Sequence, residues 1–396
     1  MIFPSRRTEN YHYAIRNLAR AAEALEQTGR EVIYLNIGDP QRYGFRPPDC
    51  VIESVTRAIR DGFTGYSHSA GILEARVSIA EYASRMGAVT GPSDVILTSG
   101  ASEAADIVLT ALVNEGDEVL LPAPGYPIYP AIMSKLGARS VYYTLDQSGA
   151  WRPSVDEVRS LVSDRTRAIV LINPNNPTGS ITPDETTRRL IEMAVERNLL
   201  VISDEVYREL CFGEQPSPSS VIAQEMGAPL ITLESLSKTH MVPGWRVGWM
   251  RYTHPEKMRD LASAINRLAD GRLCSPTATQ YAIRPALEGS RDYLPGFMKE
   301  IRRRRDISTR RAARIPGLSC VEPEAAFYMV LKTEDLRGRT DERFVLDLLA
   351  ETGVLVVHGS GFGAAPSMGY FRLVYLAGEE TLNDAFDRIE GYLGRA

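Results

Sequence analysis

Three short apolar segments constrain the fold of this chain more than any other feature. They comprise residues 168–172, 199–203 and 229–233. Each has the length of a strand and lacks alternation between apolar and polar residues, which is typical of strands buried on both faces of a parallel sheet. A helical pattern over residues 183–198 separates the first two segments. We therefore expect an α/β fold in which helices flank a mostly parallel sheet.

The composition is that of an ordinary soluble globular protein with a large core and two domains. The chain has 396 residues, of which 44% are hydrophobic and 24% charged. Its 45 basic and 50 acidic residues give a net charge of −5, which argues against binding to nucleic acid or to an anionic membrane. No export signal or apolar run of eighteen residues is apparent, and the four cysteines lie far apart, so we expect a cytoplasmic protein with reduced thiols. The five histidines lack the spacing of metal ligands, and no metal is expected.

Four successive arginines at residues 302–305 suggest a nucleic-acid site. Four consecutive residues surround a helix instead of forming a stripe along one face, however, and Glu300 and Asp306 flank them. A solvated helix surface is the favoured interpretation.

The segment at residues 235–249 points most directly to chemistry. Lys238 follows the buried segment 229–233 without neighbouring carboxylates, as suits a desolvated amine that forms a Schiff base with a carbonyl compound. Ser235 and Arg246 supply a hydroxyl and a guanidinium, the groups that hold a phosphate. Pyridoxal phosphate, a phosphorylated aldehyde, fits all three residues. The alternative is that Lys238 and Arg246 are ordinary loop and surface residues.

Three other loops offer contacts for such a cofactor. The small-residue turn at Ser102 precedes a helix at residues 103–113, and such a turn suits a single phosphate better than a nucleotide because no Walker loop is present. Tyr126 lies in a proline-stiffened loop, where it either stacks on a flat ring or packs in the core. Two X-Pro steps hold the turn at Asn176 extended, so that its side chain can point into the crevice.

Asp204 and Tyr207 follow the segment at residues 199–203. The carboxylate is either a solvated loop residue or the partner of a protonated heteroaromatic nitrogen. We favour the second interpretation, because pyridoxal phosphate withdraws electrons well only while its ring nitrogen is protonated, and a phenol can tune the ring hydroxyl.

The end of the chain predicts a smaller α+β domain. Arg372 lies between apolar strand residues and needs an anionic partner, for which a substrate carboxylate is the leading candidate. Near the other end, Gly38 interrupts a strand expected at residues 32–37; it either brings a backbone N–H close to a ligand or forms a plain turn. We expect an N-terminal arm joined to the small domain, a large cofactor-binding domain and the small domain, at residues 1–45, 46–288 and 289–396.

These motifs occur in the order and spacing of the class I/II aminotransferases of fold type I, which the chain resembles over nearly its whole length. The resemblance implies a pyridoxal-phosphate-dependent aminotransferase in which Lys238 is the Schiff-base lysine and the proton shuttle. The residues that carry it are Pro-x-Pro-x-Tyr126-Pro127, Asn176-Pro177-Thr178-Gly179, Asp204-Glu205-Val206-Tyr207, Ser235-x-Ser237-Lys238 with Arg246, and Phe371-Arg372.

The resemblance also implies the other site residues. Tyr66 would reach the phosphate in the neighbouring subunit's site, which implies a homodimer with shared active sites. Within one chain, Asp204 would pair with the pyridine nitrogen, Tyr207 and Asn176 would bond the ring oxygen, Ala101, Ser102, Ser235 and Arg246 would hold the phosphate, Tyr126 would stack on the ring, and Arg372 with Gly38 and Asn176 would bind the substrate α-carboxylate.

Within the family the chain looks most like the alanine aminotransferases. The motifs involved are Tyr13-Ala14-Ile15-Arg16, Leu35-Asn36-Ile37-Gly38-Asp39-Pro40, Ser235-Leu236-Ser237-Lys238-Thr239 and Arg272-Leu273-Cys274. There are two departures: Ala325 stands where a glycine is common, and His358 where a proline usually precedes Gly-x-x-Phe-Gly. Both concern the shape of loops on the substrate side.

The expected reaction is a ping-pong transfer of an amino group between alanine and 2-oxoglutarate, the small-molecule partners of the enzyme. Glutamate has a distal carboxylate that alanine lacks. Arg16, beside Tyr13 on the N-terminal helix, is our candidate to bind that carboxylate, and a helix-surface arginine is the alternative.

Three other functions remain open at this point. An aminotransferase of aromatic or aspartate-like specificity, or a C–S β-lyase that uses the same cofactor, would keep every cofactor residue. The cofactor-binding module of a transcription regulator would need a DNA-binding domain, but the segment before Gly38 has no helix-turn-helix pattern.

Overall fold

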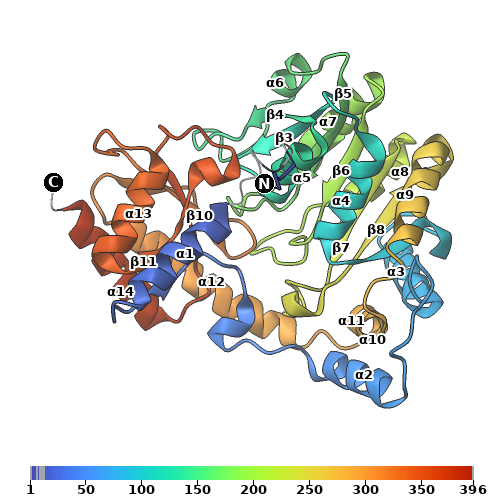
Figure 1. Cartoon of the computed structure of the whole chain (residues 1–396), viewed down its shortest axis with the longest axis horizontal. Coiled ribbons are helices and arrows are strands. Elements are labelled where there is room, and N and C mark those ends of the chain that lie inside the picture. The colour runs from blue at the N-terminus through green and yellow to red at the C-terminus, as the bar shows by residue number, and fades with distance from the viewer. Residues whose placement is uncertain (1, 6–7, 9–13, 395–396) are drawn as a thin grey trace.

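The computed structural model describes residues 2–5, 8 and 14–394 (Figure 1). A large part built on a wide sheet lies beside a smaller part that contains the C-terminal segment. The N-terminal helix α1 (Ala14–Glu26) belongs with the smaller part, although it is distant from it in sequence.

The large part contains a seven-stranded sheet. Its strand order is β2-β8-β7-β6-β5-β3-β4, and every neighbouring pair is parallel except the two that involve β8. The mostly parallel sheet expected from the sequence is therefore confirmed. In this order the strands are Val95–Ser99, Val247–Thr253, Leu230–Ser235, Leu200–Asp204, Thr166–Ile172, Glu118–Ala123 and Arg139–Thr144.

Successive side chains of β5 point to opposite faces of the sheet, and both faces are buried, which explains why its sequence is continuously apolar. Ile169 and Leu171 face one buried cluster, whereas Ala168, Val170 and Ile172 face another on the opposite side of the sheet. Helices α4, α5 and α9 contribute to the second cluster, and α6, α7 and α8 to the first. A strand with helices on both faces has no solvent side, so it carries no polar alternation.

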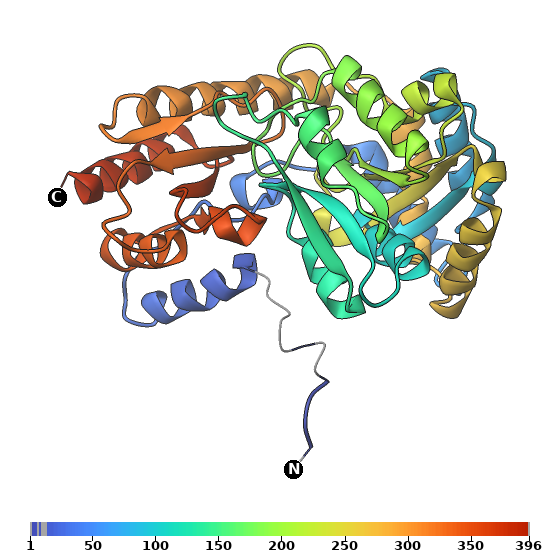
Figure 2. The ribbon, with the colours of Figure 1, turned by 90° about the horizontal axis from the view of Figure 1, so that it is seen from above.

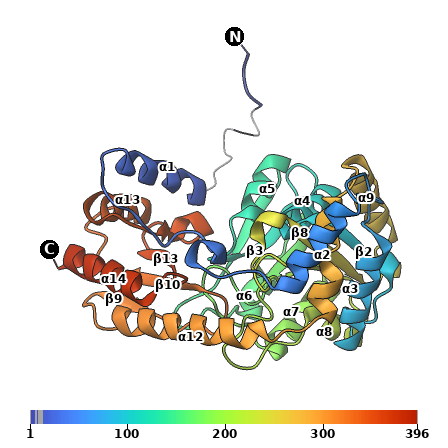
Figure 3. The same cartoon turned by 90° about the horizontal axis from the view of Figure 1, so that it is seen from below.

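Helices α2 to α11 belong to the large part (Figure 1), and Figure 3 shows α2 and α3 from below. Helices α2, α3 and α11 pack over β2 and β8 in a further buried cluster. In chain order the bounds of α2 to α11 are Asp49–Arg60, Leu73–Arg85, Ala101–Leu112, Ile128–Leu136, Val155–Ser160, Asp184–Glu196, Ser219–Met226, Arg259–Gly271, Thr277–Gln280 and Ile283–Glu288. Four short 3-10 turns are also present in or beside this part, η2 (Pro40–Tyr43), η3 (Pro92–Asp94), η4 (Pro243–Trp245) and η5 (Pro255–Lys257).

The smaller part is built on a four-stranded antiparallel sheet with the order β12-β13-β10-β9. Its strands are Val357–His358, Tyr370–Val374, Tyr328–Thr333 and Leu318–Cys320, and η6 (Gly359–Phe362) follows β12. Helices α12 (Tyr293–Ala312), α13 (Asp341–Thr352) and α14 (Glu379–Leu393) surround this sheet (Figure 2).

The N-terminal segment is held against the smaller part by backbone pairing and by apolar packing. Strand β1 (Ile33–Tyr34) pairs in parallel with β11 (Val354–Leu355). Leu18 and Ala22 of α1 are buried in the same cluster as Phe344 of α13. Strand β1 is shorter than the expected strand at residues 32–37, because the chain leaves the pairing to line a cavity.

Among the described residues, no helix is both long and apolar enough to span a lipid bilayer. Within the same residues, no group of three or more histidine, cysteine, aspartate or glutamate side chains is placed to hold a metal ion.

Candidate active site

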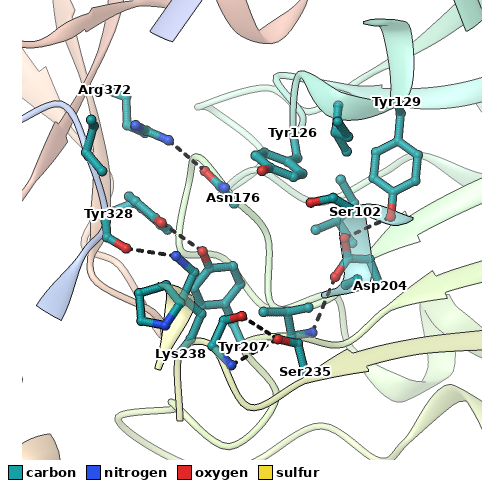
Figure 4. Close-up of a pocket in the computed structure, with 18 of the residues that line it drawn as sticks. Ser102, Tyr126, Tyr129, Asn176, Asp204, Tyr207, Ser235, Lys238, Tyr328 and Arg372 are labelled. Atoms are coloured by element: carbon teal, nitrogen blue, oxygen red, sulfur yellow. Dashed lines mark hydrogen bonds between the residues drawn. The ribbon is translucent and has the colours of Figure 1, made fainter. Parts of the chain in front are cut away.

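A cavity of about 230 Å³ lies where the large sheet meets the smaller part (Figure 4). Ile172, Asp204 and Ser235, the last residues of β5, β6 and β7, all line it. The cavity therefore lies at the carboxyl ends of parallel strands, where open α/β sheets bind ligands. The smaller part and the N-terminal segment contribute Arg372, Tyr328 and residues 36–38 to its other wall.

Lys238 is the only amine among the residues that line this cavity in the described part of the chain. Its Nζ donates a 2.8 Å hydrogen bond to the backbone oxygen of Gly38. The pKa of Lys238 is lowered to about 8, mainly by burial; the nearby charges of Arg372 and Arg246 also lower it, whereas Asp39 raises it. A substantial fraction of this amine is therefore neutral near physiological pH, as a nucleophile requires.

Asp204 is buried at the end of β6, and its carboxylate has two donors. Tyr129 donates to Oδ2 at 2.8 Å, and the backbone N–H of Val206 donates to Oδ1 at 3.3 Å. Burial raises the pKa of Asp204 to about 6, although both hydrogen bonds lower it. A carboxylate of this kind is stabilised further by a cationic partner, which the protonated nitrogen of a heteroaromatic ring would supply.

Two glycines allow Arg246 and β8 to pack closely against the start of α4. A Cβ atom on Gly100 would lie 2.5 Å from Arg246 Nη2, and one on Gly248 would lie 2.6 Å from the backbone N of Ala101. The Arg246 guanidinium donates to the backbone oxygens of Ser99 and Pro243 at 2.9 and 3.1 Å. It is thereby fixed beside the N-terminus of α4, which begins at Ala101, and helix N-termini attract anions.

Hydroxyl groups complete this anion site. The hydroxyl of Ser235 donates to Ser237 Oγ at 2.6 Å and accepts from the Ser237 backbone N–H at 2.9 Å. Ser102, Ser235, Ser237 and Arg246 all line the cavity. Hydroxyls, a guanidinium and a helix N-terminus together form a set of donors suited to a phosphate.

Arg372 is buried in β13 and lies between two aromatic rings. Its guanidinium carbon is 4.7 Å from the ring centroids of both Tyr328 and Phe362. Nη1 donates to Asn176 Oδ1 at 3.1 Å, and Nη2 donates to the backbone oxygen of Asn36. Because the aromatic faces and hydrogen bonds orient its planar fork, Arg372 is suited to bind a carboxylate with two hydrogen bonds.

Tyr207 closes the cavity behind Lys238. Its hydroxyl lies 2.7 Å from the hydroxyl of Tyr328, and burial raises its pKa well above the ordinary value. A Cβ atom on Gly38 would overlap the Tyr328 hydroxyl and lie 2.6 Å from Phe327 Cε2. Only glycine therefore lets the N-terminal segment pack so closely against Tyr328 and Phe327.

The structure brings together eleven of the fourteen residues predicted from the sequence. The residues that line this cavity are Gly38, Ala101, Ser102, Tyr126, Asn176, Asp204, Tyr207, Ser235, Lys238, Arg246 and Arg372. Tyr66 lies elsewhere, in a loop, and is 84% exposed. Tyr13 and the side chain of Arg16 lie outside the described residues.

Several functional residues were not predicted. Tyr129, Tyr328 and Ser237 line the cavity and contact Asp204, Tyr207 and Ser235, respectively. Ser237 lies two residues after Ser235 in the predicted motif, so its position in the motif could have identified it as a site residue. The two tyrosines carry no comparable signal, because each lies in an apolar pattern that also describes a packed core residue.

In the enzymes of fold type I, a lysine at the end of a mostly parallel sheet holds pyridoxal phosphate. The fold and the cavity of this chain are those of that class. The model of the family "Aminotransferase class I and II" matches residues 30–389. The chain therefore belongs to the class I and II aminotransferases, which depend on pyridoxal phosphate.

Individual relatives match along almost the whole chain. It is 34% identical to the glutamate-pyruvate aminotransferase AlaA of Haemophilus influenzae, over 99% of this chain and 98% of that one. It is 35% identical to the alanine aminotransferase of Mycobacterium tuberculosis, over 98% and 92% of the two chains. The solved structure of an alanine aminotransferase from Pyrococcus furiosus is similar with a TM-score of 0.96 and 38% identity, and all of both chains is covered.

The cavity fits pyridoxal phosphate on three independent counts. Gly100 and Gly248 let Arg246 pack closely against the N-terminus of α4, which places a guanidinium beside a helix N-terminus. Asp204 is a buried carboxylate that a protonated ring nitrogen would pair. Lys238 is a desolvated amine that lines the same cavity as Asp204. Ser102, Ser235, Ser237 and Arg246 are the residues that would hold its phosphate.

Proposed function

We propose that this aminotransferase is an alanine aminotransferase, which moves an amino group between L-alanine and 2-oxoglutarate in two half-reactions. The observation that carries the proposal is the position of Lys238 and Arg372 on one cavity, with the amine held by Gly38 and the guanidinium by Asn36 and Asn176. Similarity to proteins named alanine and glutamate-pyruvate aminotransferase supports alanine as the amino donor.

The chemistry divides between the cofactor and the chain. Bound pyridoxal phosphate supplies an aldehyde and a ring that withdraws electrons from the substrate. Arg372 binds the α-carboxylate and orients the substrate, and the neutral Nζ of Lys238 removes the proton from its Cα and returns a proton during the second half-reaction. Asp204 keeps the ring nitrogen protonated, and Tyr129 keeps Asp204 in place.

Alanine transamination is tested by following pyruvate formation from alanine and 2-oxoglutarate with purified protein and pyridoxal phosphate. We expect Lys238→Ala to lower the rate by at least about a thousandfold, because the general base is lost. Reduction with borohydride followed by peptide mass spectrometry should place the cofactor label on Lys238. Attachment of the label to another residue would contradict the proposal.

Activity measurements with a set of amino donors distinguish alanine transamination from the alternative functions. Faster turnover of aspartate or an aromatic amino acid than of alanine would assign another specificity. Release of a thiol together with pyruvate from a cysteine S-conjugate, without transfer of an amino group, would assign a C–S β-lyase instead.

We further propose that Arg16, with Tyr13 beside it, binds the distal carboxylate of glutamate. Alanine has no such group, so Arg16→Gln should slow the glutamate half-reaction and spare the alanine half-reaction. Each half-reaction can be followed alone from the absorbance of the cofactor. Equal slowing of both would contradict this assignment.

We also propose a cytoplasmic homodimer in which Tyr66 contacts the phosphate in the partner's site. Its 84% exposure in the single chain supports a role in an interface. The proposed units are an arm at residues 1–45, a large domain at 46–288 and a small domain at 289–396. Sedimentation would give the oligomeric state, and Tyr66→Phe should weaken cofactor binding without dissociating the dimer.

A further inference from the structure

His358 lies at the junction of β12 and η6, beside but outside the candidate active site. It is 6% exposed, and its Nδ1 accepts a 3.1 Å hydrogen bond from the backbone N–H of Gly361. This bond is an N-cap: a side-chain acceptor satisfies a backbone donor of the first helical turn. The cap fixes the conformation of residues 359–362.

The capped turn carries Phe362, which contacts both walls of the active site. The Phe362 ring centroid lies 4.7 Å from the Arg372 guanidinium carbon. The Phe362 backbone oxygen accepts a 2.8 Å hydrogen bond from the N–H of Gly125, the residue before Tyr126. The turn therefore connects Arg372 of the smaller part with the loop of the large part that holds Tyr126.

The cap depends on the protonation state of His358. Only an unprotonated Nδ1 can accept from Gly361. Ser360 Oγ lies 2.7 Å from both Nδ1 and Asp341 Oδ1, so its single hydroxyl proton can be donated to an unprotonated Nδ1 or to Asp341. A protonated Nδ1 would instead donate to Ser360 Oγ, which then donates to Asp341. The N–H of Gly361 would then lose its acceptor, whereas the backbone N–H of Ser360 still donates to Asp341 Oδ2 at 2.6 Å. Protonation therefore removes the cap at Gly361 and leaves Ser360 bound to Asp341.

We propose that neutral His358 is a positioning residue for substrate binding, because its cap on η6 holds Phe362 against Arg372. This inference rests on the proposed role of Arg372 as the ligand of the substrate carboxylate. Protonation of His358 releases the end of the turn at Gly361 and Phe362, loosens the stacking on Arg372 and weakens binding of the substrate with little effect on the chemical step.

The charges around His358 set the pH at which the turn is released. Burial lowers the pKa of His358 below its ordinary value of 6.5, whereas Asp341 and Glu342 of α13 oppose the shift, and His358 Nε2 lies 4.0 Å from Glu342. Across the adjacent cleft stands Tyr142 of β4, and the residue paired with His358 on β13 is the apolar Phe371. Because the pKa is lowered, the cap is present at neutral pH and is lost as the pH falls below 6.5.

The test compares His358→Asn and His358→Ala with the wild-type enzyme. Asparagine is a strong N-cap residue that does not titrate, whereas alanine removes the acceptor. His254→Asn is the matched control, because His254 also precedes a 3-10 turn but makes no side-chain cap bond. Two quantities are measured between pH 5.5 and 8: KM and kcat for alanine, and hydrogen exchange of the amides at residues 359–363.

We expect His358→Ala to raise KM about fivefold at pH 8, the effect of losing one cap, with kcat within about twofold. His358→Asn should match wild type at pH 8, and at pH 5.5 it should keep a lower KM and slower exchange than wild type. His254→Asn should follow wild type at every pH. Hydrogen-exchange rates are compared between proteins only at the same pH, because the intrinsic chemical rate of amide exchange itself changes with pH.

Two results would overturn the inference: His358→Ala with wild-type KM and exchange, or His358→Asn with the same pH dependence as wild type. The comparison of wild type with His358→Asn decides the matter if His358→Ala does not fold. Hydrogen exchange requires no catalysis. An inactive wild-type protein would therefore refute the proposed function, while exchange would still test whether His358 holds the turn.

Discussion

The Tyr129 hydroxyl donates a 2.8 Å hydrogen bond to Asp204 Oδ2, and both residues are buried. This contact joins α5 to the end of β6. It stabilises the charged carboxylate against burial, which raises the pKa of Asp204 to about 6. Asp204 is thus mostly ionised at pH 7 and becomes mostly protonated as the pH falls below about 6.

Tyr129→Phe should raise the pKa of Asp204 further, because it removes a donor that favours the charged form. We expect cofactor binding at pH 7 to weaken about tenfold, since a hydrogen bond to a charged group contributes about 1.5–3 kcal/mol. The acid limb of the binding curve should shift to higher pH. Titration with pyridoxal phosphate, followed by absorbance between pH 5 and 8, measures both effects.

Tyr143→Phe provides the control for that experiment. The Tyr143 hydroxyl is also buried, and it donates 2.8 Å to the backbone oxygen of Val170, away from the cavity. It should reduce the free energy of unfolding by about 1 kcal/mol without changing cofactor affinity. Equal losses of affinity in both variants would show that the Tyr129 contact has no special role.

Attachment of the cofactor to Lys238 should accelerate with rising pH, with a midpoint near 8. The pKa of Lys238 is lowered from 10.5 to about 8, so its neutral, nucleophilic form gains population about 2.5 pH units earlier than that of an ordinary lysine. Stopped-flow absorbance after mixing with pyridoxal phosphate measures the rate. A rate that rises only above about pH 10 would mean that the pocket does not desolvate the amine.

Gly100→Ala should weaken cofactor binding and reduce stability. Its φ of +76° disfavours a side chain, and the new Cβ would lie 2.5 Å from Arg246 Nη2. Gly116→Ala is the matched control, because Gly116 has a φ of +81° but open space around it. We expect both variants to lose about 1–3 kcal/mol from backbone strain, and only Gly100→Ala to lose about tenfold or more in affinity. Chemical denaturation and cofactor titration separate the two effects.

Arg372→Lys should raise KM for both amino and oxo acids by about a hundredfold, because lysine cannot form two parallel hydrogen bonds with a carboxylate. Arg305→Lys is the control. Arg305 is also buried, and its guanidinium lies 4.5 Å from the Phe212 ring centroid, but it does not line the cavity. A similar rise in KM for Arg305→Lys would indicate general damage to the smaller part.

The sequence predicts the central strands well because their environment is uniform. Strand β5 (Thr166–Ile172) contains the whole predicted segment 168–172, and β6 (Leu200–Asp204) differs from its prediction by one residue at each end. Strand β8 was not predicted, because Arg251 interrupts its apolar pattern. In the fold, Arg251 is buried and forms a 2.6 Å ion pair with Glu234 on β7, a partner that no local pattern reveals.

The same limit applies to the site. Lys238, Asp204 and Arg372 were identified because an isolated charged residue beside or within an apolar strand is conspicuous in sequence. Tyr129 and Tyr328 were not, because their contacts join segments 75 and 121 residues apart. Only the fold shows that their hydroxyls meet functional groups.

The β7–β8 connection contains two of the residues proposed to hold the cofactor and none of those proposed to bind the substrate. Lys238 and Arg246 both lie in this one connection, and its ends are closed by the pairing of Ser235 with Gly248 in the large sheet. Arg372 and Gly38 come instead from the smaller part and the N-terminal segment. With the proposed roles, a rotation between the two parts would admit or release the amino acid while Lys238 and Arg246 kept their positions relative to each other, so that one coenzyme molecule would serve many turnovers without leaving.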